Sequence, residues 1–167
     1  MGNPKVTVLM PVYNGEIYLA EAIESILNQT FADFEFLIID DGSTDNTWGI
    51  LSSYNDNRIR LTRNPKNVGL IESLNNALTL AIGHYIARID ADDISLPKRL
   101  EKQKEFLDKN LEIALVGSWV EIIDRQGKRI GYQKFLWDDS LIRWQLLFKT
   151  TFAHSAIMAR RDVLTAV

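Results

Sequence analysis

The sequence alternates between short, almost wholly apolar runs and longer stretches in which apolar residues recur every three or four positions. The short runs are rich in β-branched residues and bounded by turn residues, which indicates strands buried on both faces. They cover residues 6–12, 34–40, 59–62 and 85–89. The longer stretches predict helices over about 19–27, 47–54, 70–81 and 97–109, with Gly83 as the glycine that ends the third. This alternation predicts an α/β fold with a mostly parallel, doubly wound sheet.

The pattern changes after residue 110. Residues 113–135 predict a hairpin around the turn "RQGK" (125–128), followed by a helix near 139–147 and a strand near 155–159. The last run, "RRDVLTAV" (160–167), resembles the start of another helix. There is no internal repeat, low-complexity tract or linker, so we expect one domain in two parts, residues 1–110 and 111–167.

Composition excludes several classes of protein. The 46% apolar and 25% charged residues are ordinary for a globular domain, while a formal charge of −3 argues against nucleic acid as a partner. The chain has no cysteine and only two histidines, so any cation would be held mostly by oxygen. No run reaches the roughly 18 apolar residues of a membrane span, and no signal peptide is recognisable, which predicts a soluble, cytoplasmic protein.

Polar and acidic residues follow each of the four predicted strands. The stretches are "PVYN" (11–14), "DDGSTD" (40–45), "NPKNVG" (64–69) and "DADD" (90–93). The carboxyl ends of parallel strands meet at one edge of a sheet, and ligands of open α/β sheets bind in the crevice outside that edge. We therefore expect a binding site there.

The acidic stretch at residues 90–93 favours a divalent cation. Asp90 and Asp92 stand two apart, so their side chains point the same way in an extended segment. Two adjacent carboxylates repel each other unless a positive group lies between them, and paired carboxylates suit Mg²⁺ or Mn²⁺. For Asp93 and Ser95 we favour the alternative, that they cap the helix that begins near Pro97.

The other three stretches have both structural and binding interpretations. Gly42 permits a tight turn, and Ser43 or Thr44 is suited to cap the next helix, but an acid after this strand also suits the N–H of a base such as uracil. Tyr13 is either a rim tyrosine or a stacking platform for that base. Gly69 either belongs to a plain loop or permits a phosphate to approach a helix N-terminus.

In this order and spacing, the four stretches resemble the family 2 glycosyltransferases of the inverting type. The longer stretches "QTFADFEFLIIDDGSTD" (29–45), "ARIDADDISLPKRLEKQ" (87–103) and "HSAIMARR" (154–161) match as well. The resemblance runs from about Val6 to Arg161 and implies the glycosyltransferase A fold, a Rossmann-like, nucleotide-binding α/β sandwich. It implies that residues 1–110 bind the nucleotide sugar and that residues 111–167 begin the acceptor side.

The resemblance also implies a set of donor-binding residues. They are Pro11, Tyr13, Asn14, Asp41, Asn67, Gly69, Arg88, Asp90 and Ala91. The first three wall the nucleotide, Asp41 pairs with the base, and Asp90 lies toward the ribose. Asp92, with Asp90, is implied to hold Mn²⁺ or Mg²⁺ against the diphosphate.

Taken residue by residue, Arg88 and four residues outside that set are each open to two interpretations. Arg88 either pairs with the acids or a phosphate, or it faces away from them. His154 lies in a matching block and either approaches the site or does not. For Trp119, Trp137 and Trp144 we favour packing in the core over lining an acceptor site.

The implied reaction transfers a sugar, with inversion, from a nucleotide diphosphate (UDP is favoured) to a glycan or lipid-linked acceptor. A bound cation stabilises the charge that develops on the diphosphate. Peripheral association with the inner face of the membrane is a further expectation of the resemblance.

Inversion needs a general base, which the family places downstream of the block matched by "HSAIMARR", so we expect it beyond Val167. Asp138 and Asp139 come too early to match it. The alternative function is therefore a module that binds donor and metal without transferring sugar. A phosphoryl-transfer domain is disfavoured, because the phosphatase pattern places acids after the first strand, where this chain has "PVYN".

Overall fold

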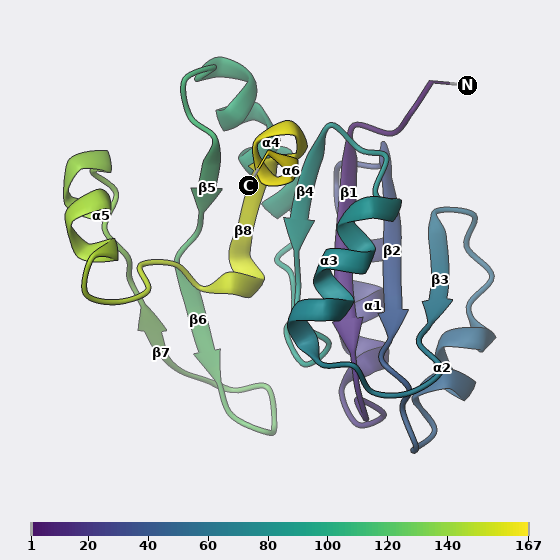
Figure 1. Ribbon diagram of the computed structural model, residues 1–167. Helices are drawn as coiled ribbons and strands as arrows, with labels where there is room; N and C mark the ends of the chain where they lie inside the picture. Colours follow the sequence, from purple (N-terminus) through teal and green to yellow (C-terminus); the bar gives the residue numbers. More distant parts are fainter. Residues whose placement is uncertain (1, 167) are drawn as a thin grey trace.

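The computed structural model describes residues 2–166, which build one six-stranded sheet and a separate hairpin (Figure 1). The strands of the sheet, in spatial order, are β3 (Ile59–Arg63), β2 (Phe34–Asp40), β1 (Val6–Val12), β4 (Tyr85–Arg88), β8 (Ile157–Arg160) and β5 (Leu115–Gly117). The first four are mutually parallel, whereas β8 runs antiparallel to both of its neighbours. The predicted, mostly parallel sheet is confirmed.

Helices cover both faces of the sheet, as the doubly wound prediction requires. Side chains of α1 (Leu19–Leu27), α2 (Thr47–Ser53) and α4 (Arg99–Lys109) share one core with the sheet. Side chains of α3 (Leu70–Leu80) and α6 (Arg161–Thr165) pack on the opposite face. Figure 1 shows α3 in front of the sheet and α1 behind it.

The central strands are mostly apolar because both of their faces are buried. Along β1, Val8 and Met10 belong to the core under α1, while Leu9 between them belongs to the core under α3. In β2, Phe36 and Leu37 divide in the same way. Alternate side chains of a strand point to opposite faces, so two helical layers demand a continuous apolar run.

Gly83 does not end the third helix, so that prediction is wrong. Helix α3 stops at Leu80, and Ala81 continues in an extended conformation. A Cβ on Gly83 would lie 2.3 Å from the backbone nitrogen of Thr7. Glycine is needed here because the chain passes directly against β1 on its way into β4.

The predicted caps of the second and fourth helices are also wrong. Helix α2 begins at Thr47 and α4 at Arg99, and neither has a side-chain cap. The Ser43 hydroxyl instead accepts from the backbone N–H of Asn14. The Ser95 hydroxyl accepts from the side chain of Gln29. Both serines bind a neighbouring element rather than the helix that follows them.

The region after residue 110 differs from its prediction in one respect. β5 joins the main sheet, and the hairpin consists of β6 (Val120–Ile123) and β7 (Arg129–Gln133), with Gly127 at φ +76° in its turn. Helix α5 (Asp139–Leu146) and the short 3₁₀ helix η1 (His154–Ala156) follow. The boundary between residues 1–110 and 111–167 stays a prediction, although β5 and β8 share the sheet of the first four strands.

The tryptophans of this region are not in the core, which corrects our expectation. Trp137 is 86% exposed, Trp144 65% and Trp119 55%. The hairpin and α5 lie to one side of the main sheet in Figure 1. No helix within residues 2–166 is long and apolar enough to cross a bilayer.

Candidate functional site

The strand order reverses between β1 and β4, which is where an open α/β sheet binds its ligand. Pairing between these strands ends at Leu9 and Arg88, although β1 continues to Val12. Pro11 is buried beyond the last pair with β4, where its missing N–H leaves no gap in that ladder. The loops after the two strands meet, because a Cβ on Gly15 would lie 3.7 Å from the Cβ of Ala91.

The loop after β1 is fastened to the loop after β2. Asn14 adopts the left-handed conformation (φ 52°), and its side-chain oxygen accepts from the N–H of Thr44 at 2.8 Å. The N–H of Gly15 donates to the hydroxyl of Thr47 at 2.8 Å. Tyr13 precedes this anchored turn and is 48% exposed. The turn therefore holds the backbone of an aromatic residue at the crevice.

Asp41 organises the loop after β3. Its buried carboxylate accepts from the N–H of Val68 at 3.0 Å, from the N–H of Gly69 at 2.9 Å and from the amide of Asn64 at 2.7 Å. Burial by itself raises the pKa of Asp41, but these hydrogen bonds outweigh it and hold that pKa below its usual value. Asp41 is therefore an ionised carboxylate with three protein partners.

The same loop explains two glycines. Gly42 has φ +72°, and a Cβ there would lie 2.5 Å from the backbone of Lys66. Gly69 has φ +93° and immediately precedes α3, with open space where a Cβ would lie. Asn67, two residues before Gly69 in the loop after β3, is exposed. Asn67 and Gly69 thus lie at the N-terminal end of α3, on the carboxyl edge of the sheet.

A positive charge does lie among the acids that follow β4, and it belongs to Arg88. Its guanidinium contacts a carboxylate oxygen of Asp90 at 2.7 Å, which is the acid-pairing interpretation of Arg88. The side chain of Arg88 is only 11% exposed, and its Nε has no partner within residues 2–166. Burial raises the pKa of Asp90, as do Asp93 and Asp92, while Arg88 opposes them.

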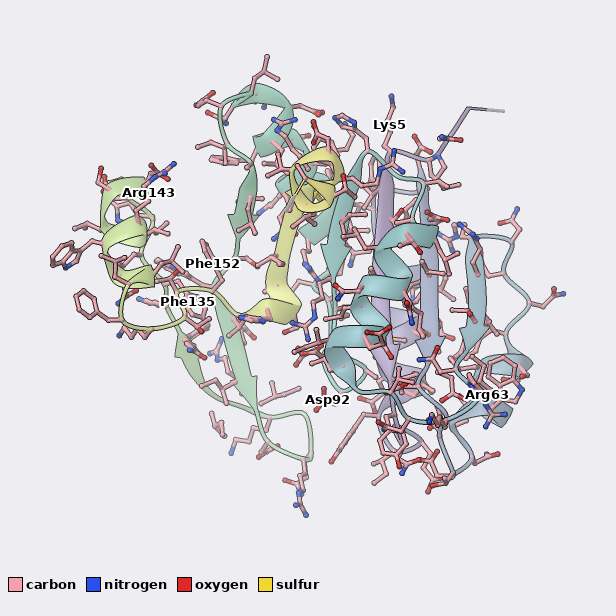
Figure 2. All side chains as sticks on the ribbon, in the orientation of Figure 1. Lys5, Arg63, Asp92, Phe135, Arg143 and Phe152 are labelled. Carbon is pink, nitrogen blue, oxygen red and sulfur yellow. The ribbon has the colours of Figure 1, made fainter. Side chains whose placement is uncertain are left out.

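Asp92 is placed differently from Asp90. Figure 2 shows it at the edge toward which the parallel strands point, the edge that also carries Arg63, whereas Lys5 lies at the opposite edge. Asp92 is exposed, and its carboxylate has no hydrogen bond or ion pair to any residue that the structure describes. The two carboxylate oxygens of Asp92 and the second oxygen of Asp90 are available as ligands to a cation.

These three carboxylate oxygens suit a cation that binds together with a phosphate-containing ligand. No group of three or more His, Cys, Asp or Glu side chains within residues 2–166 is arranged to hold a metal ion. Mg²⁺ and Mn²⁺ commonly take one or two carboxylates and complete their coordination with substrate phosphates and water. Asp92 and Asp90 match that pattern.

A glutamine that our sequence reasoning missed holds the loop after Asp92. Gln29, buried at the end of α1, donates to the carbonyl of Leu96 at 2.8 Å and accepts from the N–H of Leu100 at 3.1 Å. The Ser25 hydroxyl accepts from the N–H of Ser95 at 3.0 Å. The signal was present in the sequence, because Gln29 opens the matching stretch "QTFADF".

His154 lies on the other side of the sheet's switch point. It is exposed in η1 and lines a hollow of about 270 Å³ with Leu115, Leu146, Lys149, Thr150, Phe152 and Ile157. A second hollow, of about 370 Å³, lies between the end of α3 and α6, at the amino edge of the sheet. It contains none of the predicted site residues, so we assign it no role.

Two acids of the acceptor side are engaged in local structure. Asp138 caps α5 by accepting from the N–H of Leu141 at 3.0 Å. Asp139 pairs with Arg143 one helical turn later, at 2.7 Å. These contacts agree with leaving both residues out of the catalytic set.

The fold is an α/β domain of the glycosyltransferase A type, with polar and acidic groups at the carboxyl edge of its parallel strands. The chain belongs to the family described as "Glycosyl transferase family 2", whose profile matches residues 7–167. It is therefore a glycosyltransferase domain, and the family resemblance read from the sequence is confirmed.

Two relatives show how much of such a protein this chain represents. It is 47% identical over 131 residues to the uncharacterized glycosyltransferase MJ1057 of Methanocaldococcus jannaschii, covering 76% of this chain and 45% of the relative. It is 37% identical over 139 residues to UDP-Glc:alpha-D-GlcNAc-diphosphoundecaprenol beta-1,3-glucosyltransferase WfgD of Escherichia coli, covering 81% and 54%. The chain spans about half the length of these curated relatives.

Solved structures confirm the fold. The chain superposes on S. aureus TarS 1–349 in complex with UDP-GlcNAc with a TM-score of 0.73, at 24% identity, covering 97% of this chain and 47% of TarS. It superposes on the mannosyltransferase PcManGT from Pyrobaculum calidifontis, in complex with GDP-Man and Mn²⁺, with a TM-score of 0.72, at 19% identity, covering 99% and 47%.

Proposed function

We propose that this domain binds a UDP-sugar together with Mn²⁺ or Mg²⁺ and transfers the sugar, with inversion, to a glycan or lipid-linked acceptor. The observation that carries the proposal is the meeting of three loops at the β1–β4 switch point, each with a group suited to one part of the donor. Tyr13 suits the base, Asp41 its N–H, and Asp92 a cation on the diphosphate. The names of WfgD, with UDP-Glc, and of the TarS complex, with UDP-GlcNAc, support the choice of UDP.

The nucleotide end of the proposed site uses groups that the fold already fixes. Tyr13 offers a half-exposed ring for stacking, beside the buried Pro11 and the anchored turn at Asn14. Asp41 stays ionised through its three protein hydrogen bonds, so a base N–H would meet a charged acceptor. A charge-assisted hydrogen bond of this kind is about twice as strong as a neutral one.

The diphosphate end uses the loops after β3 and β4. Asn67 and Gly69 lie at the N-terminus of α3, where backbone N–H groups favour an anion. Ala91, small and half-buried, separates the two acids without filling the crevice. When bound, a divalent cation would neutralise the negative charge that develops on the leaving diphosphate. Asp92 has free oxygens for it, while Arg88 orients Asp90.

The alternative, a module that binds donor and cation without transferring sugar, uses the same site and lacks only a general base. Asp138 and Asp139 are occupied locally, and we propose neither as that base. A transfer assay decides between the two: labelled sugar appears in a lipid-linked acceptor if the chain is a transferase. Donor binding without product favours the module.

Association with a membrane surface is part of the proposal for lipid-linked acceptors. The segment from Trp119 to Lys149 carries six basic and four acidic residues, whereas the whole chain has a formal charge of −3. It also exposes the rings of Trp137, Trp144 and Phe148. Exposed aromatic rings beside basic side chains are typical of surfaces that lie at an anionic lipid interface.

The first experiment is titration calorimetry of UDP into the chain, with and without Mn²⁺, alongside Asp92→Asn. Affinity that rises with Mn²⁺ in the unaltered chain, and no longer does so in the variant, is the expected result. Asp93→Asn is the matched control, because Asp93 is an adjacent exposed aspartate to which we assign no ligand. If neither UDP, GDP nor dTDP binds the folded chain, the proposed function is wrong.

A further inference from the structure

Arg99 joins three elements around the proposed site. One terminal nitrogen of its guanidinium donates to the carbonyl of Arg88, at the end of β4, and to the carbonyl of Ile157, at the start of β8, at 3.1 Å. Its Nε donates to the side chain of Gln103 at 3.2 Å, within α4. The residue thus holds together the ends of two neighbouring strands and the helix that follows the acidic loop.

Gln103 makes a second link of the same kind. It is buried and donates to the carbonyl of Ala156, the last residue of η1, at 2.8 Å. The N–H of Ser118 donates to the same carbonyl at 3.2 Å. Arg99 and Gln103 therefore act as one pair that connects α4 to the turn between η1 and β8.

The charge of Arg99 has no carboxylate partner in contact among the described residues. The N–H groups of Arg99 donate to backbone carbonyls and to the side-chain amide oxygen of Gln103 instead. Burial lowers the pKa of Arg99 to about 10, and Asp93 opposes this, so the group stays protonated at neutral pH. A half-buried cation bound only to carbonyl oxygens costs free energy that a neutral side chain would not, and this raises the question of its use.

We propose that Arg99 is a positioning residue for the sugar transfer of this domain. It lies where the loop of Asp90 and Asp92 leaves β4 and where the segment of His154 enters β8, and it binds both backbones at once. It therefore sets the donor side of the site relative to the acceptor side. This inference rests on the proposed function, since it assigns Arg99 to the two halves of that site.

The test uses Arg99→Lys, which keeps the positive charge but loses the planar group that reaches two carbonyls. We expect Mn²⁺-dependent UDP affinity, measured by calorimetry, to fall about tenfold, the equivalent of roughly one charge-assisted hydrogen bond. Gln103→Met is a second variant, which removes the bond to Ala156 and keeps the side-chain length. We expect the same direction of change with a smaller size.

Arg160→Lys is the matched control. Arg160 also anchors α4 through backbone carbonyls, those of Leu107, Asn110 and Ile113 at 2.6–3.2 Å. It does so opposite Tyr85, at the start of β4 and away from the proposed site. A comparable loss of thermal stability, with unchanged UDP affinity, is the expected result for this control.

The readout that separates positioning from mere stability is the NMR signal of His154. The chain has only two histidines, and the other, His84, reports on the surroundings of Arg160, because its ring packs edge-on against Tyr85, which Arg160 contacts. Without nucleotide or metal, the ring signals of His154 should shift in Arg99→Lys and stay in place in Arg160→Lys. With UDP, broadening of the His154 signals by Mn²⁺ should also change only in Arg99→Lys.

The outcomes are distinguishable. If the unaltered chain binds no nucleotide, the proposed function fails, yet the metal-free signals of His154 still report on the link. If the unaltered chain binds UDP and both arginine variants lose only thermal stability, Arg99 is structural and the inference is wrong. If Arg99→Lys does not fold, Gln103→Met decides by the same two measurements.

Discussion

Replacing Asp41 by asparagine separates its role inside the protein from its proposed role toward the base. Oδ1 of the carboxylate accepts from the N–H of Val68 and from the side-chain amide of Asn64, and Oδ2 accepts from the N–H of Gly69. An asparagine keeps one oxygen, so its NH₂ group must face one of the two backbone N–H groups. One hydrogen bond to a charged group is therefore lost, and the NH₂ group of the asparagine and a backbone N–H face each other at a buried position.

The expected cost is about 2–3 kcal/mol of unfolding free energy, the range for a lost bond to a buried charge. Urea unfolding at pH 7 measures it. Asp45→Asn is the matched control, because Asp45 also accepts from backbone N–H groups, of Thr47 and Glu16, but lies nearer the surface. We expect less than half of the loss there.

The pH dependence gives the same prediction a second test. The pKa of Asp41 is lowered in the folded chain, so its contribution to stability is present above the unfolded value of 3.8 and is lost as the pH falls through the folded value. The difference in stability between the unaltered chain and Asp41→Asn should therefore shrink as the pH falls below about 4. A difference that is constant with pH, or a loss no larger than that of Asp45→Asn, would refute this account of Asp41.

Two further predictions concern packing and the exposed segment. Gly83→Ala should lower the unfolding free energy by about 2 kcal/mol, measured in urea, because its Cβ would lie 2.3 Å from the nitrogen of Thr7 and the backbone there must move. A change under about 0.5 kcal/mol would mean that this stretch is not held against β1. Exchanging Trp137 and Trp144 for serine should leave stability within about 0.5 kcal/mol, since both are mostly exposed. The same variant should bind less to vesicles containing anionic lipid in a flotation assay, and unchanged binding would contradict the membrane proposal.

The strands and helices could be predicted because the spacing of their apolar residues reflects the burial of both faces of the sheet. A strand such as β2, with Phe36 toward one helical layer and Leu37 toward the other, is apolar at five of its seven positions. The carboxyl-edge site followed from the same pattern, since parallel strands bring their following loops together. The path of β5 could not be predicted, because only two residues separate it from β6 and only its pairing with β8 distinguishes the two strands.

Polar residues that bind distant backbone were the part that sequence reasoning could not assign. Ser43 and Ser95 have the composition of helix caps, but each has a nearer partner in another loop, Asn14 and Gln29. The exposure of Trp144 was missed for a related reason. The hydrophobicity of a side chain indicates that its burial is favourable. It does not indicate whether the fold provides a surface that buries it.

The acidic stretch after β4 shows how charge is arranged before any ligand binds. Three aspartates within four residues would repel one another. The fold places two arginines beside them: Arg88 forms an ion pair with Asp90, and Arg99 donates to the carbonyl of Arg88. Arg88 therefore neutralises one acid and leaves Asp92 exposed without a partner among the described residues. Under the proposed function, a divalent cation would then meet Asp92, the free oxygen of Asp90 and a diphosphate rather than three unpaired carboxylates. The two arginines thus favour a metal that binds together with its nucleotide over one held permanently by the protein.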